Sequence, residues 1–186
     1  APVTVRREIA DAQGRPLPDV EIFPFLPNMV QPMVTPDEGI VGELVLLTTE
    51  TLVTRSSFAD CIGLLYGQMD QVSEEFKFDW TRYASLGIRA LIVAHPGGLD
   101  RIEWHYVAGR TPHAMVYSLP INYVRLAATE GIFRHVGQRV RLRVRTELRP
   151  LANTTYVGVL KAQKPVRQAL VLSGSYDACS ILPDRA

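Results

Sequence analysis

The strongest constraint on the fold is a strict alternation of arginine and aliphatic residues late in the chain. Between positions 138 and 148, Val140, Leu142 and Val144 alternate with four arginines: Arg139, Arg141, Arg143 and Arg145. Successive side chains of a strand point to opposite faces, so this period of two predicts a strand over 138–148. One face of that strand is apolar and the other is cationic, which requires a sheet with a core on one side.

The cationic face could follow the phosphates of a nucleic acid. The whole chain, however, has 20 Lys and Arg against 19 Asp and Glu, which gives a formal net charge of +1. No aromatic residue stands between the arginines, and no known nucleic-acid-binding motif accompanies them. We therefore favour a solvated strand face, paired in part with acidic residues of a neighbouring strand, and expect no specific nucleic-acid partner.

Short apolar runs predict the other strands, and two stretches predict helices. Val72, Phe76, Trp80 and Tyr83 recur at helical spacing, which predicts a helix over 72–86 that packs on the following strand. A second helix is expected from 119 to about 130, with Ser118 as its cap and Gly131 beyond its end. The predicted strands are 3–10, 20–25, 42–47, 61–66, 88–94, 114–117, 156–160 and 169–172. This order predicts a mixed α/β, β-rich fold.

Proline divides the chain. Seven of its thirteen prolines fall within the first 36 residues. Proline neither donates to a strand ladder nor continues a helix, so this region should consist of short edge strands and turns, with one turn at 13–16. We expect a Pro-rich N-terminal β segment over 1–38, a central domain over 39–150, and returning strands over 151–186.

Composition narrows the class of protein. Apolar residues make up 47% of the 186 residues and charged residues 21%, both ordinary for a globular domain. The longest uninterrupted apolar run has five residues, at 90–94, so we expect no membrane span in this segment. The first residues show no signal-peptide pattern, which leaves the compartment unknown. Of the two cysteines, Cys61 is expected to be a buried free thiol, and a bridge to Cys179 is not favoured.

One loop gathers residues that could bind a ligand. After the strand predicted at 88–94, carboxylates and imidazoles cluster at His95, Asp100, Glu103, His105 and His113. The four histidines of the chain are ten, eight and 22 positions apart, which is too wide for a helical or short-loop metal pair. We favour the interpretation that this is an ordinary solvated loop, and keep a ligand-binding loop as the alternative. The sequence has no glycine-rich phosphate loop, no G-x-S-x-G elbow and no H-E-x-x-H.

Two apolar runs, 42–45 and 61–66, precede the first predicted helix, which ends in Tyr83-Ala84-Ser85-Leu86-Gly87-Ile88 and leads into a third run. This arrangement resembles a protease-associated domain, in which a helix ends in an A-x-x-G-A-like turn before an apolar strand. Gly87 keeps the glycine, whereas Ile88 departs from the usual alanine. The segment 112–117 resembles the proline-led strand of that family. The resemblance implies a swivelling β/β/α fold.

The end of the chain supplies a second resemblance. The apolar run at 169–172 leads into Ser173-Gly174-Ser175-Tyr176-Asp177, which resembles the entry into the zinc aminopeptidase domain of the group that includes glutamate carboxypeptidase and the transferrin receptor. The family pattern there is H-Y-D. Asp177 is retained, but Ser175 replaces the zinc-binding histidine, and serine is not a usual zinc ligand. The resemblance implies no catalytic residue, metal site or cofactor in this chain, and zinc only in the parent protein.

The function that these resemblances imply is that of a non-catalytic protease-associated accessory domain. Such a domain shapes substrate access or binds a peptide or protein partner, in addition to contacting the remainder of its own parent chain. Two alternatives stay open: the parent protein is an active zinc aminopeptidase with its catalytic residues beyond this chain, or a pseudopeptidase whose ectodomain serves in binding or assembly. The family alone favours an extracytoplasmic location.

Overall fold

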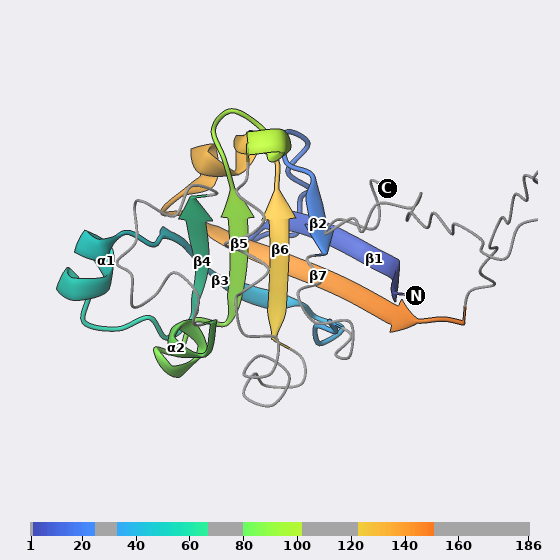
Figure 1. Cartoon of the computed structure of the whole chain (residues 1–186), viewed down its shortest axis with the longest axis horizontal. Coiled ribbons are helices and arrows are strands. Elements are labelled where there is room, and N and C mark those ends of the chain that lie inside the picture. Colours follow the sequence, from blue (N-terminus) through green and yellow to red (C-terminus); the bar gives the residue numbers. More distant parts are fainter. Residues whose placement is uncertain (1, 25–32, 67–79, 102–122, 151–186) are drawn as a thin grey trace, which may run out of the picture.

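A seven-stranded sheet organises the described part of the molecule. The computed structural model describes residues 2–24, 33–66, 80–101 and 123–150 of the chain (Figure 1). The strands lie in the order β1-β7-β3-β4-β5-β6-β2. Their bounds are β1 Pro2–Asp11, β2 Ile22–Pro24, β3 Ile40–Leu46, β4 Cys61–Tyr66, β5 Ala90–Ala94, β6 Val124–Ala128 and β7 Arg139–Leu148. The helices are α1 Thr49–Thr54, α2 Trp80–Ser85, and the short 3-10 helices η2 Leu99–Arg101 and η3 Glu130–His135.

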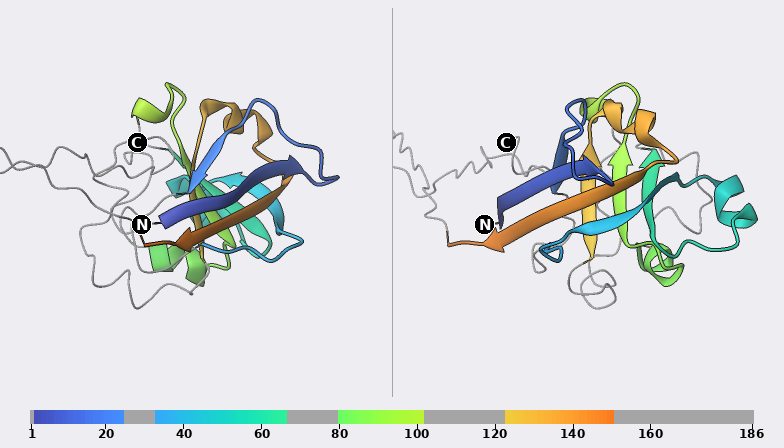
Figure 2. Two further views of the ribbon diagram at one scale, coloured as in Figure 1. Left: turned by 90° about the vertical axis from the view of Figure 1, so that its right-hand side faces the viewer. Right: turned by 180° about the vertical axis from the view of Figure 1, so that it is seen from behind.

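The sheet combines a parallel centre with antiparallel flanks. β3, β4, β5 and β6 are mutually parallel, whereas β7 runs antiparallel to both β3 and β1, and β2 runs antiparallel to β6. The long β1–β7 pair crosses the upright β4, β5 and β6 obliquely (Figure 1). The sheet curls until its two edge strands, β1 and β2, contact one another (Figure 2). The fold is therefore β-rich and nearly closed, with few helices.

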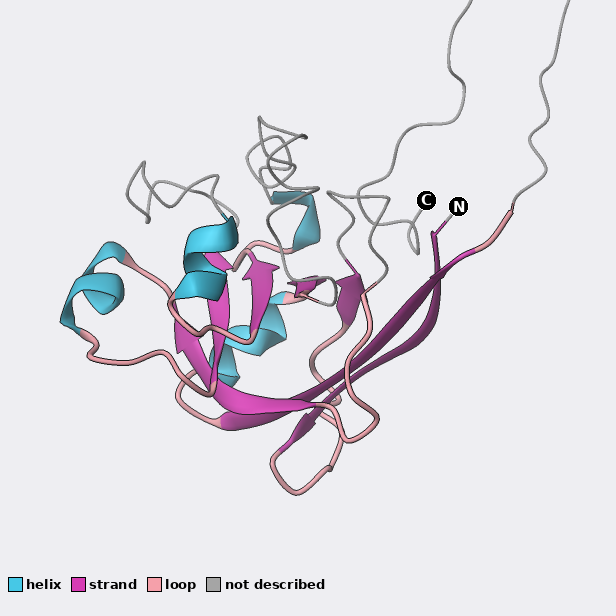
Figure 3. Cartoon of the chain, turned by 90° about the horizontal axis from the view of Figure 1, so that it is seen from below, coloured by secondary structure: helices cyan, strands magenta, loops and turns pink. Residues whose placement is uncertain are grey.

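Apolar side chains pack on both faces of the parallel strands. An inner cluster fills the concave side and includes Ile92, Leu126 and Leu142, while an outer cluster on the other side includes Leu91, Tyr83 and Phe58. Every residue of β5 and of β6 is buried. α2 lies below the lower ends of β4 and β5, and α1 lies on the side of the molecule opposite the start of β1 (Figures 1 and 3). No helix in the described part is long and apolar enough to cross a membrane.

Several sequence predictions are confirmed. The alternating strand is β7, the 61–66 strand is β4, and β3 and β5 lie within a residue or two of the expected bounds. The turn at 13–16 forms, with Gly14 at φ +87° and its N–H donating to the Asp11 carbonyl oxygen at 3.0 Å. Gly87, at φ +89°, donates to the carbonyl oxygen of Ala84 and ends α2 as expected.

The second predicted helix is wrong where the structure describes it, because Val124–Ala128 forms β6. All five residues are buried, so the strand lacks the alternation that would have indicated it, and its leucine and alanines favour a helix locally. Gly131 does not follow a helix either. It lies in η3, where a Cβ would sit 2.0 Å from the carbonyl oxygen of Asp19.

Other differences concern short or undescribed elements. α1 was not predicted; Thr48 caps it, accepting from the Thr51 N–H at 3.2 Å while Thr51 Oγ1 accepts from the Thr48 N–H at 2.6 Å. Of the first predicted helix, the structure describes α2, where Tyr83 is buried as expected. The strands predicted at 114–117, 156–160 and 169–172 lie outside the described residues. β1 and β2, from the Pro-rich segment, belong to the same sheet as the strands of 39–150.

Candidate functional site

The two edges of the sheet leave an open seam. β1 and β2 stand at opposite ends of the strand order, and no ladder of hydrogen bonds joins them within the described ranges. A groove of about 330 Å³ lies along this seam. Its lining comes from β1, from the connection to β2, from β2 itself and from one residue of β7: Arg7, Glu8, Ile9, Ala10, Gly14, Pro16, Leu17, Val20, Glu21, Ile22 and Arg143.

The connection between β1 and β2 shapes one end of the groove. It turns back on β1, so that the Asp11 N–H donates to the Arg15 carbonyl oxygen at 2.9 Å and the Leu17 N–H donates to Ile9 at 3.2 Å. The Asp11 carboxylate accepts from the backbone N–H and from the Nε of Arg15, at 2.9 and 2.7 Å. These contacts hold the turn against β1. The last residue of β2 is Pro24, which cannot donate a hydrogen bond and ends a strand of only three residues.

The groove has an apolar floor and a charged rim. Ile9, Val20 and Ile22 are buried beneath it. On the rim, the guanidinium of Arg7 lies 4.7 Å from the centre of the Phe23 ring, a cation–π contact that crosses the seam from β1 to β2. An apolar floor between two strand edges suits an extended chain with small apolar side chains.

Glu8 carries the ionic part of the rim. Its carboxylate lies 2.9 Å from Arg6 Nη2 and 3.6 Å from Arg143 Nη1. The hydrogen bond from Arg6, together with the charge of Arg143, holds the pKa of Glu8 below its usual range. Glu8 stands directly opposite Arg143 in the β1–β7 register. The expected pairing of the arginine face with an acidic neighbour is therefore confirmed at this position.

The rest of the cationic face behaves as the alternation predicts. Val140, Leu142 and Val144 are buried, whereas Arg139 and Arg145 are exposed and the two arginines between them are half-buried. Weak and nonspecific nucleic-acid binding stays a prediction.

A polar cluster fixes the segment that enters β2. His135 Nε2 lies 3.2 and 3.3 Å from the two carboxylate oxygens of Asp19, and Arg134 Nη1 lies 3.6 Å from one of them. The hydrogen bond from His135 is the main cause that lowers the pKa of Asp19. His135 Nδ1 in turn lies 3.2 Å from Gln138 Oε1. The cluster ties η3 to the groove wall at Val20, and sequence reasoning missed it because its partners are far apart in the chain.

The structure brings few of the predicted site residues together. His95 follows β5, and its Nδ1 accepts from the Gly97 N–H at 2.9 Å, which closes a tight turn. Asp100 lies in η2. In the described part of the chain, no group of three His, Cys, Asp or Glu residues could hold a metal ion. The remaining predicted positions lie outside the described residues: Glu103, His105, His113, Ser175 and Asp177.

Cys61 is a buried free thiol, as expected. Burial raises the pKa of that thiol, which disfavours the reactive thiolate. Cys179 lies outside the described residues.

Comparison with known proteins adds a weak structural likeness. No family model matches the sequence, and no characterised protein matches it. A match among solved structures is the crystal structure of the psychrophilic subtilisin-like protease Apa1 from the Antarctic psychrotroph Pseudoalteromonas sp. AS-11, with a TM-score of 0.41 and 12% identity. The alignment covers 77% of this chain and 33% of that protein, so the chain spans about a third of its length.

Proposed function

We propose that this chain is a non-catalytic accessory domain of the protease-associated type, and that its seam groove binds an extended peptide or protein segment. The observation that carries the proposal is the groove itself, an apolar-floored opening between two strand edges of an otherwise hydrogen-bonded sheet. Strand edges bind extended chains through backbone hydrogen bonds, and pockets beside them select alternate side chains.

The local sequence supports the type of domain. The resemblance rests on a helix that ends at a glycine before an apolar strand, and Gly87 ends α2 three residues before the buried β5 begins. The seven-stranded, nearly closed sheet agrees with a β-rich accessory domain. The proposed role, which is to bind a segment of substrate or of a partner, needs no reactive side chain.

The test uses a synthetic peptide as probe. Acetyl-Lys-Val-Thr-Val-Glu-amide favours an extended conformation, and its counterpart with N-methyl groups on both valine amides lacks the donors that a strand edge needs. We expect the first peptide to shift the backbone amide signals of Ile9, Val20 and Ile22 in NMR spectra, with a dissociation constant below about 1 mM. The N-methylated peptide should produce no saturable shift.

Two substitutions in β1 test whether the peptide binds in the groove or elsewhere along the strand. Ala10→Phe places a large ring in the groove and should weaken binding at least about tenfold, or roughly 1.4 kcal/mol. Val5→Phe adds the same ring at an exposed position of β1 that does not line the groove, and should leave the affinity unchanged. Equal binding of both peptides, or equal affinity of both variants, would show that the groove is not the binding site.

A further inference from the structure

One buried arginine, on the strand next to the β2 edge of the sheet, does not line the seam groove. Arg125 is the second residue of β6 and is 2% exposed. Alternation along the strand places its side chain on the same face as Tyr123 and Ala127, which belong to the outer cluster. In the β5–β6 register its neighbour is Leu91, another member of that cluster. A guanidinium is thus buried on an apolar face.

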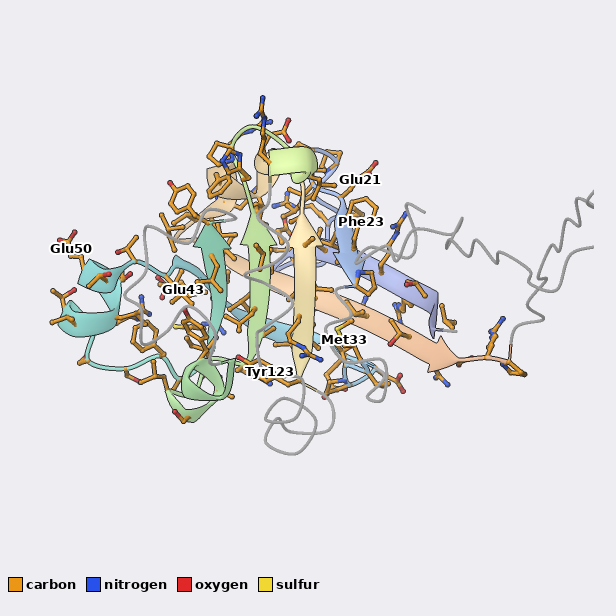
Figure 4. The ribbon with its side chains drawn as sticks, in the orientation of Figure 1. Glu21, Phe23, Met33, Glu43, Glu50 and Tyr123 are labelled. Atoms are coloured by element: carbon orange, nitrogen blue, oxygen red, sulfur yellow. The ribbon has the colours of Figure 1, made fainter. Side chains whose placement is uncertain are left out.

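Two nitrogens of this guanidinium lack an acceptor. Within the described residues, neither Nε nor Nη1 of Arg125 has a hydrogen-bond partner, and the hydroxyl of Tyr123 has none either. The backbone N–H of Arg125 is occupied, because it lies 3.3 Å from the sulfur of Met33, near the lower part of β6 (Figure 4). The unmet hydrogen-bonding capacity therefore belongs to the side chains.

The two buried threonines of the described part, Thr35 and Thr146, both have hydrogen-bond partners. Thr35 Oγ1 accepts from the Val144 N–H at 3.1 Å, and Thr146 Oγ1 accepts from the Met33 N–H at 2.7 Å. Arg141 and Arg143 also have an unpartnered Nε, but another nitrogen of Arg141 donates to the carbonyl oxygen of Ala12 and another nitrogen of Arg143 reaches Glu8. Arg125 differs because it is buried and, among the described residues, no hydrogen bond or ion pair includes its guanidinium.

The charge on Arg125 persists at neutral pH. Burial lowers its pKa to about 10, which still leaves the guanidinium protonated at pH 7. A buried cation without an acceptor is costly, and such groups in proteins are normally paired with an anion. Among the described residues, the arrangement therefore lacks one negative charge and at least one acceptor oxygen.

We infer that Arg125 and Tyr123 form a binding site for the carboxylate of a ligand with an apolar tail. A carboxylate supplies one negative charge and two acceptor oxygens, which matches one guanidinium and one phenol. A phosphate dianion would leave an excess negative charge among apolar side chains. The outer cluster around the site, which includes Leu91 and Tyr83, suits the tail.

Tyr123 marks the side from which the ligand enters. It is 8% exposed and stands at the amino-terminal end of β6, one residue before the strand begins (Figure 4). Arg125 is deeper on the same face. The carboxylate would therefore pass the phenol and reach the guanidinium, with both groups donating hydrogen bonds to it.

The test compares hexanoate with hexanamide, which has the same length but no charge. Titration of the wild-type protein is followed by the NMR signal of the Arg125 side-chain Nε–H. We expect hexanoate to move this signal downfield in a saturable manner and to raise the melting temperature. Hexanamide should bind at least about tenfold more weakly, because it loses a charge-assisted hydrogen bond.

Matched variants assign the effect to the site. Arg125→Met should abolish the hexanoate-dependent rise in melting temperature. Tyr123→Phe should weaken hexanoate binding about threefold to tenfold. Arg145→Met makes the same change at an exposed arginine of β7 and should leave hexanoate binding unchanged. If Arg125→Met does not fold, the wild-type titration and Tyr123→Phe decide. The inference is wrong if hexanoate gives no saturable shift, if hexanamide binds equally well, if Arg125→Met still responds, or if inorganic phosphate binds more tightly than hexanoate.

Discussion

β6 and β7 place the same kind of side chain in very different surroundings. Each strand carries arginine between aliphatic residues, yet Arg125 is 2% exposed whereas the side chain of Arg145 is 58% exposed. β6 lies between β5 and β2 with apolar clusters on both faces, while β7 has a core on one face only. The exposure of an arginine is therefore decided by what covers the second face of its strand, and the two strands differ in that cover.

The largest expected effect is a truncation in β6. Leu126 is fully buried in the inner cluster, so Leu126→Ala should lower the free energy of unfolding by about 2–5 kcal/mol, through lost burial and the cavity that remains. Arg145→Ala in β7 is the control and should change it by less than about 0.5 kcal/mol. Urea denaturation measures both. Similar losses of unfolding free energy for the two variants would contradict the view that β6 is buried on both faces and β7 on only one.

Glycine substitutions test how tightly side chains pack on the outer face of the parallel strands. A Cβ on Gly63 of β4 would lie 2.5 Å from Leu47 Cδ1 and 2.9 Å from Leu91 Cδ2, so Gly63→Ala should cost about 1–3 kcal/mol through overpacking of the outer face. Gly137, before β7, has nothing within 4 Å of such a Cβ, although its φ is +82°. Gly137→Ala should therefore cost only the backbone strain, about 1 kcal/mol. A smaller cost at Gly63 than at Gly137 would mean that the outer face is loosely packed.

Methionine in place of arginine should have opposite effects in the two strands. Without a bound carboxylate, Arg125→Met removes a buried charge and should raise the free energy of unfolding by about 1 kcal/mol. Arg143→Met removes a partly exposed ion pair with Glu8 and should lower it by about 0.5 kcal/mol. Thermal unfolding in carboxylate-free buffer gives both values. A clear loss of stability for Arg125→Met in that buffer would indicate that the charge has a partner within the protein.

The smallest expected effect concerns pH and the exposed face of β1 and β7. Arg6 and Arg143 lower the pKa of Glu8, so its contribution to stability is complete above the unfolded value of about 4.3 and is lost as the pH falls through the lower folded value. Wild type should therefore be more stable than Glu8→Gln at pH 7, and the two should converge at pH 3. Denaturation midpoints at both pH values provide the measurement, and a difference that persists at pH 3 would contradict the role of the carboxylate.

The same contrast explains what could be predicted from the sequence. β7 was predictable because one exposed face leaves a period of two, and β4 because an apolar run ends at turn residues on both sides. β6 was not predictable, because burial on both faces removes the alternation of apolar and polar residues. The wrong helix was predicted there because residues such as Leu126 and Ala127 favour a helix locally. The groove itself was not predictable, because it depends on how closely β1 and β2 approach each other in the folded sheet. The sequence indicated only that the Pro-rich segment forms edge strands. The Asp19–His135 contact leaves no local signal at all.

The pairing of β1 with β7 has a consequence for the order of folding. Glu43 lies opposite Cys61 across the parallel strands, a short separation along the chain, whereas Pro2 lies opposite Leu148. Contacts between distant positions form late, because a long loop must be closed before they contribute. We expect the parallel centre to form first and β1 to dock last, so that amide protons of β1 exchange with solvent before those of β4 and β5. The groove would then be the last feature to form and the first to be lost.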